Sequence, residues 1–89
     1  MISKEITIVN KLGLHARAAV KFVNLASRFR SDIRLMANYR RVNGKSIMGI
    51  MMLAASRGTG VTLEIDGPDE EEALAQLESL ILERFGEPE

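Results

Sequence analysis

Residues 2–29 read ISKEITIVNKLGLHARAAVKFVNLASRF, and this stretch contains two different hydrophobic periods. In residues 2–9, Ile2, Ile6 and Ile8 alternate with polar residues, which is typical of a half-buried β-strand. From Ala16 onward the apolar residues recur at intervals of three and four, which is typical of an amphipathic helix. These helical positions are Ala19, Phe22, Val23, Ala26 and Phe29. The stretch therefore predicts a strand, a turn over residues 10–13 and a helix in direct succession.

The middle of the chain predicts more strands. Apolar and polar residues alternate over residues 32–37 and again over residues 61–66. Between them, a turn at Asn38 and a short strand through Val42 are closed by Asn43-Gly44, a strong turn signal.

Two further helices are expected after these turns. Ser46 is suited to cap a short helix that runs through about Leu53.

After Gly67-Pro68, Asp69 and Glu72 resemble a capping box at the start of a helix that ends at Gly86. The apolar stripe of this last helix is Ala73, Leu74, Leu77, Ile81 and Phe85. The predicted order is βαββαβα, which favours an α+β fold with one largely antiparallel sheet and the helices on one face.

Length and composition limit the possible classes of protein. A chain of 89 residues that is 46% hydrophobic and 27% charged is expected to form one globular domain over residues 1–89. The longest apolar run, residues 50–55, is too short to cross a bilayer, and no secretory signal follows Met1, so we expect a cytoplasmic protein with no membrane partner. With no Cys and one His, we expect no disulfide, thiol chemistry, metal site or cofactor.

The net charge of zero hides a division along the chain. Residues 1–63 hold eleven bases and two acids, a net charge of +9, and residues 64–89 hold ten acids and one base, a net charge of −9. A basic face would speed encounter with acidic partners, if the fold separates the two parts. The same charge leaves a nucleic-acid-binding domain open as an alternative. We expect no nucleic-acid partner, because three Phe, one Tyr and no Trp supply few stacking platforms.

The segment that carries chemistry is Gly13-Leu14-His15-Ala16-Arg17, at the predicted start of the first helix. His15 stands where an N-cap belongs although His is a poor cap, and Arg17 opposes the helix dipole. Residues that do not suit their place in the local secondary structure occur most often at functional sites. The free amides of Ala16 and Arg17 suit a phosphate group, and the helix field favours a neutral His15 able to attack phosphorus. The alternative from the residues alone is a structural or merely exposed His15.

Three segments together resemble one known family. They are Asn10 to Arg17, Asn43 to Met51, and Gly67 to Ala73, and they resemble the signatures of the histidine-containing phosphocarrier proteins, HPr, of the bacterial phosphoenolpyruvate-dependent phosphotransferase system. The resemblance spans nearly the whole chain and implies an open-faced β-sandwich, a four-stranded antiparallel sheet covered by three helices.

The resemblance also implies residue roles and partners. His15 would accept a phosphoryl group through Nδ1 from enzyme I and pass it to the A components of enzymes II, with Arg17 and the amides of Ala16 and Arg17 stabilising it. Such a protein is a carrier and not an enzyme with its own turnover. The family usually has Pro after the Arg, whereas this chain has Ala18, and this difference puts the rate or partner preference in question more than the chemistry.

Ser46 has two interpretations. On the residues alone it is a helix cap, and the resemblance adds regulatory phosphorylation by HPr kinase/phosphorylase. A partner-docking face is expected on the first two helices, where flexible Met side chains suit several partners. Its expected members are Leu12, Ala16, Val20, Lys21, Asn24, Ser27, Ile47, Met48 and Met51.

Three alternatives to a sugar-transport carrier remain at this point. The first is an HPr paralogue of a regulatory or nitrogen-related branch. The second is the small nucleic-acid-binding domain, and the third is a structural interaction module with an idle His15.

Overall fold

The computed structural model describes residues 1–89 and contains four strands and three α-helices in the predicted order. The strands are β1 (Ile2–Thr7), β2 (Asp32–Ala37), β3 (Arg40–Asn43) and β4 (Gly60–Asp66). The α-helices are α1 (Ala16–Ala26), α2 (Ile47–Met52) and α3 (Glu70–Leu82), and a 3₁₀ turn, η1 (Arg84–Gly86), follows α3. The predicted α+β class and open-faced sandwich are confirmed.

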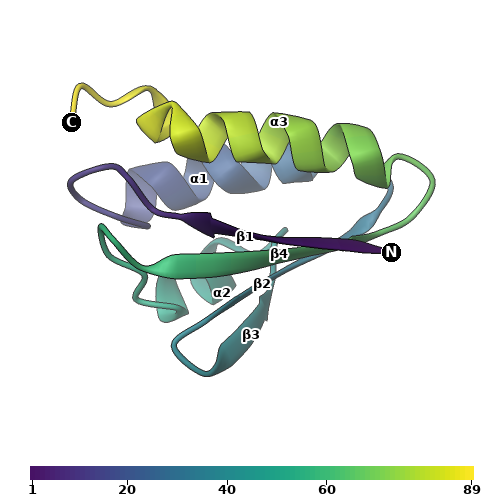
Figure 1. The fold of residues 1–89 in the computed structure, drawn as a ribbon, viewed down its shortest axis with the longest axis horizontal. Helices are drawn as coiled ribbons and strands as arrows, with labels where there is room; N and C mark the ends of the chain where they lie inside the picture. The colour runs from purple at the N-terminus through teal and green to yellow at the C-terminus, as the bar shows by residue number, and fades with distance from the viewer.

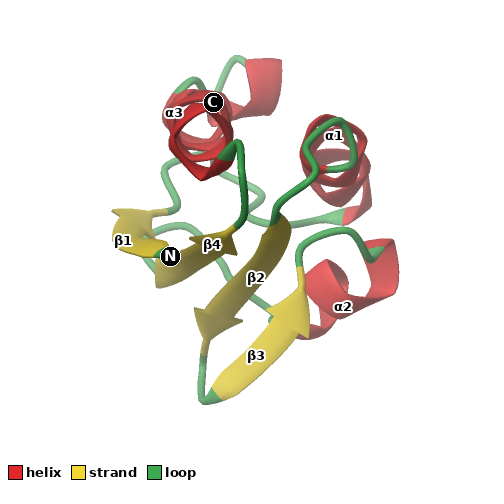
Figure 2. Cartoon of the chain, turned by 90° about the vertical axis from the view of Figure 1, so that its right-hand side faces the viewer, coloured by secondary structure: helices red, strands yellow, loops and turns green.

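The strands form one antiparallel sheet in the order β1-β4-β2-β3. All three helices lie on the same side of this sheet, and its other side is open (Figures 1 and 2). Alternation explains the layering, because every second side chain of a strand points to the helices. Facing pairs such as Ile33 with Ile65 and Leu35 with Leu63 are fully buried between sheet and helices.

The hairpin between β2 and β3 turns at Asn38 and Tyr39, which both have positive φ. Two successive residues with positive φ are the requirement of a type I′ hairpin, whose twist matches the flanking strands. The Asn38 side chain donates a hydrogen bond to the Leu53 carbonyl oxygen at 2.8 Å. The turn predicted at Asn38 is therefore confirmed, and it ties the hairpin to the end of α2.

The helices bury the stripes that the sequence indicates. Phe22 of α1, Ile50 of α2 and Leu77 of α3 are all fully buried in one apolar core. The Ser46 hydroxyl accepts a hydrogen bond from the Gly49 amide at 3.1 Å, so the predicted cap of α2 is confirmed. None of the helices has the length and hydrophobicity that a membrane-spanning segment requires.

The predicted capping box of the last helix is wrong. The Asp69 side chain makes no hydrogen bond to its own helix and instead accepts three from the loop between α1 and β2: from the Arg30 amide at 2.8 Å, the Ser31 amide at 3.0 Å and the Ser31 hydroxyl at 2.5 Å. Glu70 accepts a hydrogen bond from the Gly67 amide at 3.1 Å. Unpaired amides of the α1–β2 loop lie within reach of Asp69 and compete successfully for its carboxylate.

Two predicted boundaries also differ. Regular pairing of the first strand ends at Thr7, although Ile8 remains buried and exchanges backbone hydrogen bonds with Gly58 and Thr59. The last helix ends at Leu82 and not at Gly86. Phe85 has a φ of +55° that allows its ring to enter the core, and this geometry interrupts the helix.

Candidate functional site

The start of α1 presents a half-exposed imidazole beside free backbone amides. His15 is the N-cap of α1, with extended backbone and a side chain that is 27% exposed. Its carbonyl oxygen accepts the first helical hydrogen bond, from the Ala19 amide at 2.9 Å. The amides of Ala16, Arg17 and Ala18 have no protein acceptor, so they are free to bind an anion.

Gly13 fixes the approach of the chain to this helix. Its φ is +66°, and an added Cβ would lie 2.5 Å from the Ala55 carbonyl oxygen. The Leu14 amide donates to the same oxygen at 2.9 Å. Glycine is therefore required where the loop crosses the segment after α2, and the crossing delivers His15 to the surface.

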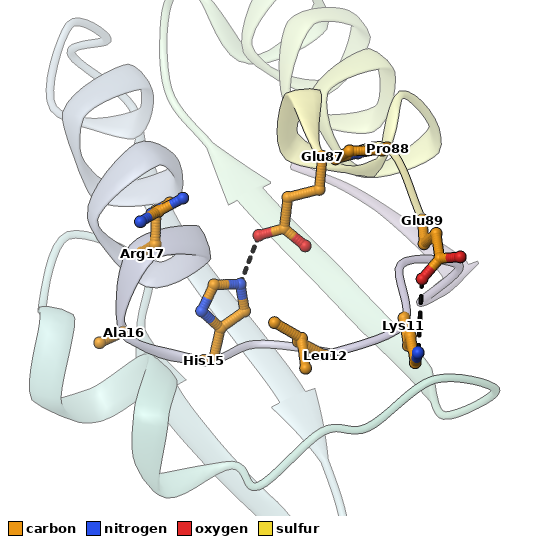
Figure 3. A pocket seen from close by; sticks show the side chains of 8 residues that line it. All are labelled: Lys11, Leu12, His15, Ala16, Arg17, Glu87, Pro88 and Glu89. Atoms are coloured by element: carbon orange, nitrogen blue, oxygen red, sulfur yellow. Dashed lines mark hydrogen bonds and ion pairs between the residues drawn. The ribbon is translucent and has the colours of Figure 1, made fainter.

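Arg17 occupies the first turn of α1 on the same open pocket as His15. The pocket has a volume of about 740 Å³ and includes residues from three segments (Figure 3). They are Lys11, Leu12, His15, Ala16, Arg17, Glu87, Pro88 and Glu89. Arg17 is exposed and takes part in no hydrogen bond or ion pair, so its guanidinium is free to pair with an anion that enters.

Glu87 is the member of the site that sequence reasoning missed. Its carboxylate contacts Nε2 of His15, from 72 positions further along the chain (Figure 3). The other carboxylate oxygen accepts a hydrogen bond from Asn10 Nδ2 at 3.0 Å. No local pattern around Glu87 indicates this contact. The neutral protonation state expected for His15 stays a prediction. The structure adds that the Glu87 carboxylate lies beside the ring.

Several groups act on the charge of Glu87. Burial raises the pKa of the carboxyl, whereas the hydrogen bonds from Asn10 and His15 and the positive charge of Lys21 lower it, and the net shift is downward. The pKa of Glu87 therefore lies below its ordinary value, and the group is an anion at neutral pH.

The expected docking residues are all exposed, and they lie on two helices that pack against each other, on the loop before α1 and, for Ser27, directly after α1. On α2, Ile50 and the following Leu53 point into the core, whereas Met48 and Met51 are 72% and 45% exposed. Met52, which the sequence analysis did not assign to the surface, is 54% exposed. Lys21 differs from the other members because its Nζ donates to the Phe85 carbonyl oxygen at 2.6 Å and faces the C-terminal segment.

The basic residues of the first 63 positions are partly used within the fold. Arg34 pairs with Asp32 at 3.1 Å, Arg41 with Glu64 at 3.1 Å, and Lys45 donates to the Phe29 carbonyl oxygen at 2.8 Å. Lys4 pairs with Glu78 at 2.6 Å, and Lys11 with Glu89 at 3.4 Å. The basic and acidic parts of the sequence therefore meet at several points, which weakens the case for a continuous basic surface that binds nucleic acid.

Known proteins resemble this chain along its full length. A family model described as "PTS HPr component phosphorylation site" matches residues 2–83. The phosphocarrier protein HPr of Cupriavidus necator is 56% identical over 89 residues, covering 100% of both chains, and that of Neisseria meningitidis serogroup B is also 56% identical over the same share. The crystal structure of an HPr from Thermoanaerobacter tengcongensis superposes with a TM-score of 0.95 at 49% identity, covering 100% of both chains.

Proposed function

This chain belongs to the HPr family of phosphocarrier proteins of the phosphotransferase system, and we propose that His15 is the residue on which it carries the phosphoryl group. The observation that carries the proposal is the position of this half-exposed imidazole at the start of α1, beside amides with no protein acceptor. Phosphoryl transfer depends mainly on positioning and charge stabilisation, so a small site suffices when the partner supplies the remaining groups.

In the proposed reaction, phospho-enzyme I is the donor. Nδ1 of His15 attacks the phosphorus atom, and the oxygens of the transferred group lie near the amides of Ala16 and Arg17. The guanidinium of Arg17, free of other partners, pairs with the same oxygens. The group then passes to an A component of an enzyme II, and the chain returns to its starting state. The protein therefore acts as a stoichiometric carrier and not as an enzyme with its own turnover.

The partners of both steps would share one docking surface. The exposed side chains of α1 and α2, with Leu12 beside them, border the start of α1 and include the flexible Met48 and Met51. A surface of this kind accepts partners of different shape, because Met side chains repack at small cost.

Ser46 is proposed as a regulatory phosphorylation site for HPr kinase/phosphorylase. Its hydroxyl caps α2 and lies next to the exposed Ile47 and Met48. A phosphate at this position is compatible with the start of a helix, and it adds about two negative charges beside the docking surface. Partner binding would fall through charge and desolvation, without a change of fold.

Labelling by enzyme I tests the assignment of His15. The chain is incubated with enzyme I, phosphoenolpyruvate and Mg²⁺, and intact-mass spectrometry counts the phosphoryl groups. We expect one acid-labile group on the wild type, none on His15→Ala, and one on the control Ser46→Ala. Labelling of His15→Ala at the wild-type rate would refute the site. A wild type that accepts no group from enzyme I would refute the carrier function and favour the structural module.

A further inference from the structure

The C-terminal segment after α3 folds back over the start of α1. Lys21 Nζ donates to the Phe85 carbonyl oxygen at 2.6 Å, and the Lys11 amide donates to the Glu89 carbonyl oxygen at 3.0 Å. Between these two attachments, the Glu87 side chain is only 12% exposed. Phe85 is fully buried and anchors the segment in the core. The segment therefore holds one carboxylate at a fixed place beside His15.

We propose that Glu87 is a positioning residue for phosphoryl transfer, and that it keeps the proton of His15 on Nε2 so that Nδ1 is the free nucleophile. The proposal rests on the proposed function of His15 as the phosphoryl acceptor. Its basis is a chain of three side chains, in which Asn10 Nδ2 holds one oxygen of Glu87 at 3.0 Å and the other oxygen contacts Nε2 of His15.

The contact assigns the two ring nitrogens to different tasks. A carboxylate only accepts hydrogen bonds, so Nε2 must be the protonated nitrogen of a neutral ring in this contact. The tautomer of a histidine is set by the partner of its other nitrogen, and a carboxylate also fixes the orientation of the ring. Nδ1 then has a free lone pair, and it lies on the side of the ring away from Glu87 (Figure 3).

The same arrangement balances the reaction without a proton transfer. The Nδ1 lone pair forms the new N–P bond while the bond between phosphorus and its donor atom on phospho-enzyme I breaks, and the electron pair of that bond stays on the donor atom. The ring of His15 now carries phosphorus on Nδ1 and a proton on Nε2, so it is a cation. The Glu87 carboxylate, at the Nε2 edge of the ring, compensates this positive charge, and the phosphoryl oxygens lie at the Nδ1 edge. On transfer to the acceptor, the N–P electron pair returns to Nδ1 and the ring leaves as the neutral Nε2–H form.

The negative charge of Glu87, in its contact with His15, depends on the other charged groups nearby. Other charged groups face it from α1, from the loop before α1 and from the C-terminal segment. They are Arg17 and Lys21 on α1, Lys11 on the loop, and Glu89 on the C-terminal segment. Three of these four groups are positive, so the surroundings favour the ionised form of Glu87.

The test compares Glu87→Gln with the wild type and with Glu71→Gln, a control that removes an exposed carboxylate from the first turn of α3, outside the site. Each chain carries ¹⁵N-labelled His15 and is phosphorylated with enzyme I and phosphoenolpyruvate. NMR then follows the Nε2 proton of the phosphorylated ring against pH, and rapid quench follows the rate of phosphoryl transfer. Because a charge-compensating partner is lost, we expect Glu87→Gln to lose the Nε2 proton about one pH unit lower, a tenfold change in affinity for that proton.

The transfer rate supplies the second readout. We expect it to fall about tenfold in Glu87→Gln, at the low end of the about 10- to 100-fold that carboxylate partners of metal-binding imidazoles contribute, because this ring is partly solvated. Glu71→Gln should match the wild type in both measurements. If Glu87→Gln is phosphorylated and its pH profile and rate equal those of the control, the positioning role is refuted and the carrier function stands. A wild type that takes no phosphoryl group would instead overturn the proposed function itself.

Discussion

The Ser46 hydroxyl caps α2 and is also the proposed site of regulatory phosphorylation, and two substitutions distinguish these two roles. It accepts a hydrogen bond from the Gly49 amide at 3.1 Å at the start of α2, a helix of only six residues. Removal of an N-cap hydroxyl costs about 1 kcal/mol, with a range of about 0.5–2 kcal/mol. We therefore expect Ser46→Ala to lower the free energy of unfolding by about 1 kcal/mol. Asp caps a helix about as well as Ser, so the free energy of unfolding of Ser46→Asp should lie within about 0.5 kcal/mol of the wild-type value.

Urea unfolding followed by circular dichroism measures these differences. For a slope of about 1 kcal/mol/M, the midpoint of Ser46→Ala should fall by about 1 M. Its Tm should fall by about 4–8 °C, as expected for a domain of this size. Ser27→Ala is the control, because Ser27 is exposed and its side chain makes no hydrogen bond, and it should change stability by less than about 0.5 kcal/mol.

The same pair of variants tests the regulatory proposal. Ser46→Asp keeps the cap but adds a negative charge next to Ile47 and Met48, so it should accept a phosphoryl group from enzyme I more slowly than Ser46→Ala does. Equal stability of Ser46→Ala and the wild type would refute the cap, and equal transfer rates of the two variants would refute the charge argument.

Two further predictions concern the stability of the fold. Leu77→Ala removes a fully buried side chain on the inner face of α3 and should cost about 2–5 kcal/mol in urea unfolding, against a typical total of about 5–15 kcal/mol; a loss below about 1 kcal/mol would contradict this placement. The pKa of Asp69 is lowered because its carboxylate accepts hydrogen bonds from the Ser31 hydroxyl and the Arg30 amide. The ionised Asp69 therefore stabilises the fold at any pH above the ordinary Asp pKa of about 3.9. This contribution is lost as the pH falls through the lower pKa that Asp69 has in the folded state. Asp69→Asn should therefore lose less stability than the wild type on acidification below about pH 4, and parallel curves of stability against pH would exclude the contribution of Asp69.

Much of the local structure followed from the sequence. The alternation of Ile33 with Arg34 and of Leu63 with Glu64 determined strands with one buried face, because successive side chains of a strand point to opposite sides. The intervals of three and four after Ala16 determined the inner face of α1. The unusual His15 at the start of that helix indicated the candidate site, because the local geometry of a helix start is encoded within a few residues.

Long-range choices were decided only by the tertiary structure. The sequence did not determine that β4 would pair between β1 and β2, nor that Asp69 would bind the Arg30 and Ser31 amides in place of capping its own helix. The contact of Glu87 with His15 spans 72 positions and leaves no local signal. Periodicity and capping depend on neighbouring residues, whereas a partner distant in the chain is selected only when the packed core brings competing polar groups within hydrogen-bond distance of one another.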